Sequence, residues 1–248
     1  MKNYLLMTAT VTPPAGELLL TRIVPAQRLQ DYTEALKFYL DEQNSYIDGV
    51  IFVDNSGHSL EELRLIAQDY LGSKQIEILS FFGLDYPVEY GRGYGELKLI
   101  EYAYLNSKIM QAMKEDDRFW KVTGRLQVTT IKKIIKLSSA YFDLCADFRC
   151  SRGHVDTRLI AFSIAGYKKY IYGRFHELPG LIIETWLFNK LTPLLSTKEG
   201  ANIQTEFKMV AKFKGFSGDG NFNYMAPKQQ FIYFCRSVYL AVKYLFKH

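Results

Sequence analysis

Short apolar runs alternate with helix-like segments along the first half of the sequence, and this alternation limits the chain to a small group of folds. Each run is bounded by polar or turn residues, which is typical of a buried strand. Strands that alternate with helices predict a mostly parallel sheet with helices on both faces. The predicted strands cover residues 4–11, 49–53, 76–82 and 119–122, and the predicted helices cover 31–41, 59–70 (with Ser59 as its cap) and 96–113.

The second half of the sequence shows a weaker pattern. Residues 141–148, 157–164 and 205–213 are predicted strands, and residues 182–195 and 228–248 are predicted helices. No internal repeat, low-complexity tract or linker separates this half from the first. A chain of 248 residues can form one large α/β domain or two small ones. We expect one.

Charge and cysteine content narrow the expected partners and compartment. Lys and Arg number 31 against 26 for Asp and Glu, a formal charge of +5. This mild excess suits phosphate-bearing ligands or an anionic membrane surface, but it lacks the concentrated basic stripe of a nucleic-acid-binding protein. The three cysteines have neither disulfide nor zinc-site spacing. The N-terminal apolar run is too short for a signal peptide, and none reaches the ~18 residues of a spanning helix. We therefore expect a cytoplasmic protein with no nucleic-acid partner.

Polar residues follow two of the predicted strands at their carboxyl ends. The first strand ends in residues 8–10 (TAT), and the second runs into residues 53–57 (VDNSG). In open α/β sheets, ligands bind beyond the carboxyl ends of the strands. Asp54 is therefore a candidate ligand contact, although an aspartate after a buried strand is also a common helix cap.

A glycine-rich, basic segment at residues 91–97 (GRGYGEL) leads into the predicted helix 96–113. Glycines let the backbone approach a phosphate, and a helix N-terminus offers unpaired N–H groups to an anion. The segment lacks the G-K-[ST] ending of a P-loop and lies too far from the first strand for a Rossmann dinucleotide site. A flexible loop without a ligand is the alternative interpretation.

Basic residues also occupy the end of the fourth predicted strand, in residues 119–125 (FWKVTGR). Lys121 and Arg125 could neutralise a diphosphate without a metal ion, because both are positively charged hydrogen-bond donors. A basic strand end that serves only solubility is the alternative.

Taken together, these three segments resemble the nucleotide-sugar-binding half of a GT-A-type glycosyltransferase. The resemblance implies a Rossmann-type, mostly parallel sheet flanked by helices, with residues 1–128 as the donor-binding half and 129–248 as the acceptor-binding half of one domain. Most GT-A enzymes end the fourth strand in Asp-x-Asp, which holds a divalent metal on the donor diphosphate. Here residues 121–125 (KVTGR) take that place, so no metal is expected, with Mn²⁺ or Mg²⁺ as the alternative. The implied donor-binding residues are Thr8, Thr10, Asp54, Gly93, Gly95, Glu96, Lys121, Thr123, Gly124 and Arg125.

This K-x-T-G-R group resembles one found in bacterial transferases for cell-surface polysaccharide. It implies transfer of a sugar from a nucleotide-sugar donor to a glycan or lipid-linked acceptor of lipopolysaccharide, O-antigen or capsule. The alternative is a non-catalytic carbohydrate- or nucleotide-binding protein of the same fold. A nucleotidyltransferase is expected to carry a G-x-G-T-R-type loop after the first strand, which residues 12–16 (TPPAG) do not match.

The second half offers carboxylates for catalysis at Asp156, Glu184 and Asp219. An inverting transfer needs a carboxylate to take the proton of the acceptor hydroxyl, whereas a retaining transfer needs none. The sequence does not choose between them. Glu184 opens the predicted helix 182–195, whose N-terminus favours the ionised carboxylate, and it is the first candidate base. Asp156 is the second. The structural alternatives are a helix-dipole contact for Glu184 and an ion pair for Asp156.

The C-terminal segment 228–248 combines aromatic and aliphatic residues with lysines and an arginine, as basic amphipathic helices do. It either lies on the anionic inner face of a membrane, where lipid-linked acceptors reside, or packs on the domain.

Overall fold

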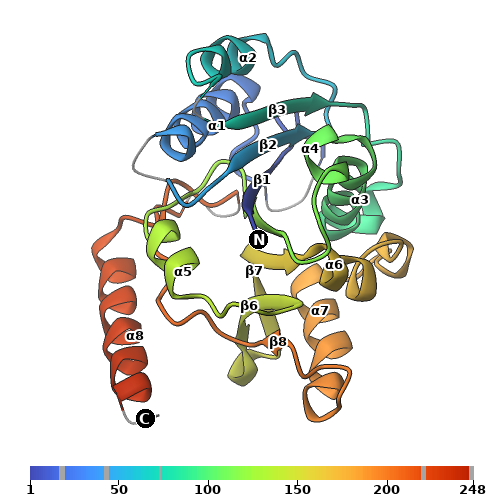
Figure 1. The fold of residues 1–248 in the computed structure, drawn as a ribbon. Helices are drawn as coiled ribbons and strands as arrows, with labels where there is room; N and C mark the ends of the chain where they lie inside the picture. The colour runs from blue at the N-terminus through green and yellow to red at the C-terminus, as the bar shows by residue number, and fades with distance from the viewer. Residues whose placement is uncertain (17–19, 42–44, 73, 219–221, 246–248) are drawn as a thin grey trace.

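A central sheet organises the protein (Figure 1). The computed structural model describes residues 1–16, 20–41, 45–72, 74–218 and 222–245. Within these residues the sheet has seven strands: β1 (Asn3–Ala9), β2 (Gly49–Asp54), β3 (Gln75–Ser80), β4 (Arg118–Thr123), β6 (Leu144–Arg149), β7 (His154–Ser163) and β8 (Ile203–Gln204). Their spatial order is β3-β2-β1-β4-β7-β6-β8. Only β7 is antiparallel to its neighbours among these described strands. The mostly parallel α/β sheet expected from the sequence is therefore confirmed.

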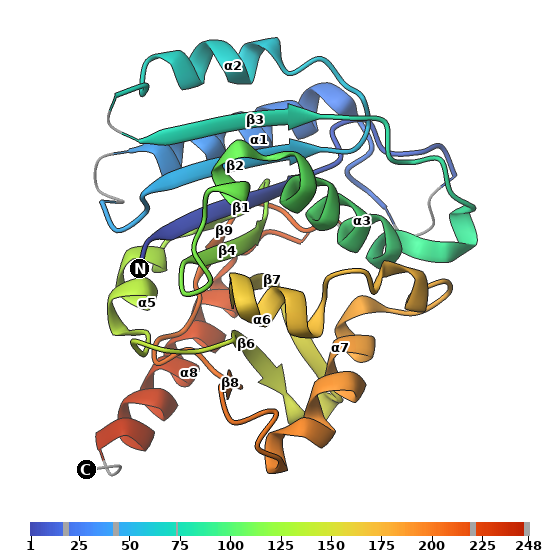
Figure 2. The same cartoon turned by 45° about the vertical axis from the view of Figure 1, so that its right-hand side comes forward.

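Helices cover both faces of the sheet, as the two views show (Figures 1 and 2). The first face carries α1 (Pro25–Leu40), α2 (Glu61–Gln68), α5 (Ile131–Leu137) and α8 (Pro227–Leu245), and the second carries α3 (Gly91–Asn106), α4 (Lys108–Gln111), α6 (Ile164–Tyr170) and α7 (Ile183–Leu191). Short elements complete the chain: η2 (Val88–Tyr90), η3 (Cys150–Arg152), η4 (Phe175–Glu177), η5 (Thr192–Ser196), and the ribbon strands β5 (Gln127–Val128) and β9 (Phe213–Lys214).

Strand alternation builds one hydrophobic core beneath each helix layer. Leu5 and Met7 of β1 pack into the core of the first face, whereas Tyr4 and Leu6 pack into that of the second. Successive side chains of a strand point to opposite faces, so a strand buried on both faces is apolar at nearly every position. This is why β1 and β2 read in the sequence as unbroken apolar runs.

The first half follows the predicted element order with shifted helix starts. Helix α1 begins at Pro25, before the predicted residue 31, because proline needs no N–H partner at the first helical position. The N-cap of α2 is Leu60, with no side-chain hydrogen bond, so Ser59 does not cap it. Helix α3 begins at Gly91. The glycine-rich segment is therefore the start of the helix, and its interpretation as a preceding loop is wrong.

The second half departs further from expectation. The predicted strand 205–213 is wrong: between β8 and β9 the chain forms no strand and crosses the first face of the sheet. Phe207 and Val210 are buried there, and the Val210 carbonyl accepts a hydrogen bond from Thr130 Oγ1 at 2.9 Å. Side-chain and loop partners thus satisfy backbone groups that a strand would have paired. The pattern also did not reveal α5, α6 or the β5–β9 ribbon.

Candidate active site

A cavity of about 580 Å³ opens at the carboxyl edge of the parallel strands. The ends of β1 and β4 contribute Thr8, Thr10 and Thr123 to its lining. Strand β7 runs antiparallel to β4, so its first residues, from His154, lie at this same edge. The N-terminal ends of α3 and α7 also line it, as do α1 and residues 217, 218 and 224. The topology thus gathers segments that are far apart in the sequence around one cavity, where ligands of open α/β sheets bind.

An irregularity in β7 lies at this cavity. The β6–β7 pairing shifts register after Ala146, which pairs with Ile160, while the next residue, Asp147, pairs with Asp156. Residues 157–159 therefore have no partner on β6. Such bulges re-aim side chains and are over-represented beside active sites. Here Arg158 packs against Phe213 and Tyr224 on the same face of the sheet as Leu159, so the alternation of side chains changes phase at this point.

The side toward α3 and α7, the carboxylate wall, presents Glu96 and Glu184 to the cavity. Glu184 stands in the first turn of α7 and accepts a hydrogen bond from Thr157 Oγ1 at 2.8 Å. Glu96 pairs with the buried Lys121, whose Nζ also donates to the Thr157 carbonyl at 2.8 Å. Lys121 thus lies behind the wall and fixes Glu96 and Thr157. It does not line the cavity.

The side toward α1 and α8, the guanidinium wall, presents Arg28, Arg125 and Arg158. Arg28 is almost fully buried, and its Nε donates to the Thr10 carbonyl at 2.7 Å, so it mainly holds the end of β1. Arg125 Nε donates to the Phe216 carbonyl at 3.2 Å. Arg158 is held by Asp156 through its Nε, at 2.8 Å, and its Nη2.

Asp156 lines the cavity, but its charged partners mark it as a member of a structural ion pair. Burial raises the pKa of its carboxyl group, but hydrogen bonds and charge from Arg158 and Arg149 outweigh burial and hold the pKa well below the ordinary value. A carboxylate with such a low proton affinity is a poor general base, because the favoured catalytic pKa lies near the working pH. The ion-pair interpretation fits Asp156, and Glu184 is the better candidate base.

Asp54 lies behind the cavity and is fully buried. Its carboxylate accepts hydrogen bonds from the Val11 N–H at 2.7 Å and from the Ser56 N–H and hydroxyl at 2.9 and 2.7 Å. Burial raises the pKa of Asp54, and these hydrogen bonds oppose that rise. Its neighbour Asn55 does line the cavity and accepts a hydrogen bond from Thr10 Oγ1 at 2.7 Å. Asp54 thus shapes the turns that present Thr10 and Asn55.

Close packing explains two of the predicted glycines. A Cβ on Gly93 would lie 2.9 Å from the Cβ of Ile183, so glycine there lets the starts of α3 and α7 approach each other. A Cβ on Gly124 would lie 2.7 Å from the Thr8 carbonyl oxygen. Real Cβ atoms essentially never come so close. The glycines are therefore needed for packing, whether or not a phosphate also approaches.

Most of the sequence-predicted site residues share this cavity. Those that line it are Thr8, Thr10, Gly93, Gly95, Glu96, Thr123, Arg125, Asp156 and Glu184, whereas Asp54, Lys121 and Gly124 stand behind it. Asp219 lies outside the described residues. Lining residues that the sequence did not single out as ligand contacts include Arg28, Tyr32, Asn55, Tyr86, Arg158 and Tyr224. For Arg28 a signal existed, because it occupies the buried stripe of α1 with Tyr32, Ala35 and Tyr39.

The donor set at this cavity does not fit a divalent metal ion. Oxygen-binding cations need several carboxylates directed at one point, but Glu96 is paired with Lys121 and Asp156 with two arginines. Within the described residues, no group of three or more His, Cys, Asp or Glu side chains could hold a metal.

No protein-family model and no curated protein matches the sequence. Solved structures with a similar chain path include a 4-diphosphocytidyl-2C-methyl-D-erythritol synthase (TM-score 0.44, 10% identity, covering 93% of this chain and 96% of that one). HddC from Yersinia pseudotuberculosis aligns with TM-score 0.39 and 12% identity over 95% of this chain and 99% of its own. Core-mannan synthase A from Aspergillus fumigatus, in its Mn/GDP form, aligns with TM-score 0.44 and 11% identity over 82% and 72%. Scores this low carry no functional argument, so function is inferred from the cavity and the motifs.

Proposed function

We propose that the chain is a glycosyltransferase that moves a sugar from a nucleotide-sugar donor to an acceptor hydroxyl. The observation that carries this proposal is the division of the cavity: Glu184 faces it from a helix N-terminus, and guanidinium groups face it from the other side of the sheet. A nucleotide sugar shows a similar contrast, because its anionic diphosphate lies directly beside the hydroxyl-bearing sugar. Arginine suits the first and carboxylates suit the second.

In the proposed inverting reaction, Glu184 takes the proton of the acceptor hydroxyl. The acceptor oxygen then forms a bond to the anomeric carbon while the bond from that carbon to the diphosphate oxygen breaks. The nucleoside diphosphate leaves with the electron pair. Guanidinium groups that already surround the leaving oxygens stabilise the charge that develops there. Thr157 positions the Glu184 carboxylate through its 2.8 Å hydrogen bond.

Transfer is proposed to need no divalent metal, because arginine side chains replace the cation that Asp-x-Asp would hold. Initial rates measured with EDTA and with added Mn²⁺ or Mg²⁺ test this. Equal rates are expected. Complete loss on chelation that Mn²⁺ restores would contradict it.

The proposed acceptor is a bacterial surface glycan of the lipopolysaccharide, O-antigen or capsule type, on the strength of the K-x-T-G-R resemblance at residues 121–125. The deciding experiment supplies a panel of UDP-, dTDP- and GDP-sugars and follows nucleoside diphosphate release with and without acceptors. Acceptor-stimulated release supports transfer. Tight binding without any release would instead identify the non-catalytic binding protein of the same fold.

We further propose that α8 contacts the anionic cytoplasmic face of a membrane. One face of α8 packs on the domain through Tyr233 and Leu240. Its other face leaves Phe231, Phe234 and Leu245 at least 63% exposed, and the helix contains no acidic residue. Arg236 and Lys243 pair with Asp147 and Glu206 of the domain, so the exposed apolar side chains, with Lys228 at the start of the helix, carry this proposal. Apolar side chains beside a positive charge favour an anionic lipid surface.

Vesicle sedimentation tests the α8 proposal. Binding to phosphatidylglycerol vesicles should exceed binding to phosphatidylcholine vesicles. It should fall in a Phe231→Ser, Phe234→Ser double variant, with Leu65→Ser on α2 as the matched exposed control. Equal sedimentation of the double variant and the wild type would refute membrane contact. Within the described residues, no helix has the length and apolar character needed to cross a bilayer.

A further inference from the structure

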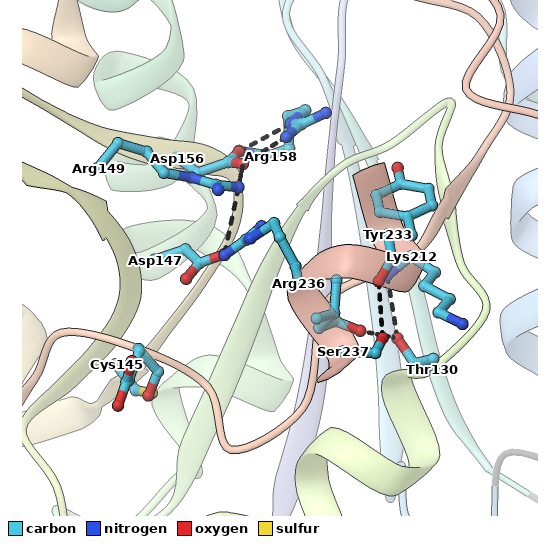
Figure 3. A network of polar contacts seen from close by, with 12 residues as sticks. Thr130, Cys145, Asp147, Arg149, Asp156, Arg158, Lys212, Tyr233, Arg236 and Ser237 are labelled. Carbon is cyan, nitrogen blue, oxygen red and sulfur yellow. Dashed lines mark hydrogen bonds and ion pairs between the residues drawn. The ribbon is translucent and has the colours of Figure 1, made fainter. Parts of the chain in front are cut away.

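Five alternating charges connect helix α8 to the cavity (Figure 3). Arg236 of α8 donates to Asp147 at 2.8 Å, and Arg149 lies 3.4 Å from Asp147 and 3.2 Å from Asp156. Asp156 then holds Arg158. The chain contains three arginines and two aspartates, so one positive charge is left uncompensated within it. Its cavity end is Arg158.

The Arg158 guanidinium is fixed on several sides. Its Nε and Nη2 are directed to Asp156. Its central carbon, Cζ, lies 4.4 Å from the ring centroid of Phe213 and 5.0 Å from that of Tyr224. A guanidinium has five N–H groups in one plane, and Asp156 takes two. Burial lowers the pKa of Arg158, but hydrogen bonding and charge from Asp156 outweigh burial and raise it, so the group stays charged. The result is an oriented cation whose side chain keeps 27% exposure at the cavity.

Arg125 stands on the same wall of the cavity. Arg125 Nε donates to the Phe216 carbonyl, and Phe216 forms a bridge with Asn223. The next residue, Tyr224, is the one whose ring meets Arg158. No carboxylate pairs with Arg125 among the residues that the structure describes. Two guanidinium groups therefore line one cavity, on either side of the Phe216–Asn223 bridge, and among the described residues their only acidic partner is Asp156.

We propose that Arg158 and Arg125 form a two-guanidinium subsite for a phosphoryl group of a substrate. The inference rests on the proposed function, because that function supplies two phosphoryl sources: the donor diphosphate and a phosphate-linked acceptor. The non-bridging oxygens of a phosphoryl group share its negative charge and accept several hydrogen bonds, so it can bind both arginines at once. Asp156 serves as the positioning residue that holds the Arg158 guanidinium at the cavity.

Calorimetric titration with inorganic pyrophosphate tests the subsite directly. The wild type should bind it, and Arg158→Gln should reduce affinity by about tenfold to a hundredfold, the effect of losing a hydrogen bond to a charged group. Arg158→Lys keeps the positive charge beside Asp156 but not the fork geometry, and should also bind weakly. It covers the case in which Arg158→Gln fails to fold. Arg64→Gln on α2, outside the cavity, is the matched control and should bind like the wild type.

Two results overturn the subsite: no pyrophosphate binding by the wild type, or unchanged binding by a folded Arg158→Lys variant. Steady-state kinetics separates the two sources. A raised KM for the sugar nucleotide alone assigns the subsite to the donor diphosphate, and a raised KM for a phosphate-linked acceptor alone assigns it to the acceptor. Pyrophosphate has neither base nor sugar, so Arg158-dependent binding in a protein that turns over no nucleotide sugar would refute the proposed function and leave the anion subsite standing.

Discussion

The two walls of the cavity are built on different physical principles. On the carboxylate wall, Glu184 sits in the first turn of α7 and has one neutral partner, the Thr157 hydroxyl. On the guanidinium wall, Arg158 is held by a carboxylate and two aromatic rings, at the end of a chain of charges. A group that must change its protonation state needs few charged partners. A group that must remain charged and immobile benefits from many.

The same contrast separates the two acids of β7 and α7. Asp156 has charged partners on both sides, and its pKa is depressed. Glu184 has none among the described ion pairs. Position along the cavity would allow either to act on an acceptor, but only Glu184 is free of a structural ion pair. If the contrast is functional, proton transfer depends on the carboxylate wall and anion binding depends on the guanidinium wall.

The largest effect is expected from Glu184→Gln, which keeps size and most hydrogen bonding but removes basicity. Loss of a general base typically slows turnover by 10²–10⁴-fold, while the dissociation constant for the donor should stay unchanged because the guanidinium wall is intact. Turnover and calorimetric donor binding are the measurements, with Glu61→Gln on α2 as the control. Near-normal turnover, or a product that retains the donor's anomeric configuration, would contradict the assignment.

The next largest effect is expected from Asp156→Asn, on stability. Arg158 and Arg149 would lose a shared buried partner, and breaking such a pair from one side costs about 3 kcal/mol of unfolding free energy at pH 7. The folded-state pKa lies below the unfolded value of about 3.9. The contribution is therefore complete above that value and is lost as the pH falls through the folded-state pKa.

Urea unfolding of the wild type and the Asp156→Asn variant, at pH 7 and at a series of acid pH values, measures this contribution. The difference between the two proteins should shrink only below about pH 4. A difference that stays constant to pH 2, or that is already absent at pH 7, would show that the ion pairs of Asp156 do not stabilise the fold.

The sequence predicted much of the cavity lining that the first half of the chain supplies, because strand ends are a local property. An apolar run that stops at polar residues places Thr8, Thr10 and Thr123 at one edge once the sheet is parallel. It predicted less about what each residue does there. Asp54 and Lys121 are polar residues near the same edge, but their side chains point into the protein. A strand turns alternate side chains to opposite faces, and both residues have buried partners.

The second half was harder because its features depend on distant contacts. Arg158 belongs to the guanidinium wall because β7 shifts register against β6. No residue type near positions 157–159 signals that shift. Likewise, residues 205–213 alternate enough to suggest a strand, yet the segment is held by Thr130 and by core packing across the sheet face. Tertiary contacts override local propensity in such segments.

A smaller effect is expected from Lys121→Met, which separates support of a wall from ligand binding. The variant leaves Glu96 without its counter-charge and the Thr157 carbonyl without a donor, which should cost about 2 kcal/mol of unfolding free energy. Pyrophosphate affinity should stay within about twofold of the wild type, because Lys121 does not line the cavity. Unfolding in urea and calorimetry are the measurements. If Lys121→Met weakens pyrophosphate binding as strongly as Arg158→Gln does, Lys121 contacts the anion directly. The anion is then not bound by the guanidinium wall alone.

The smallest effect is expected from Arg236→Gln, at the outer end of the charge chain. Asp147 would keep Arg149, 3.4 Å away, so the unfolding free energy should fall by only about 1 kcal/mol. Pyrophosphate affinity should change less than twofold, because Arg158 is fixed by Asp156 and its aromatic neighbours without help from α8. Lys228→Gln, an exposed change on the same helix, is the control for both measurements. If Arg236→Gln instead weakens pyrophosphate binding tenfold while Lys228→Gln does not, the guanidinium wall extends to α8. Contact of that helix with a membrane would then act directly on anion binding in the cavity.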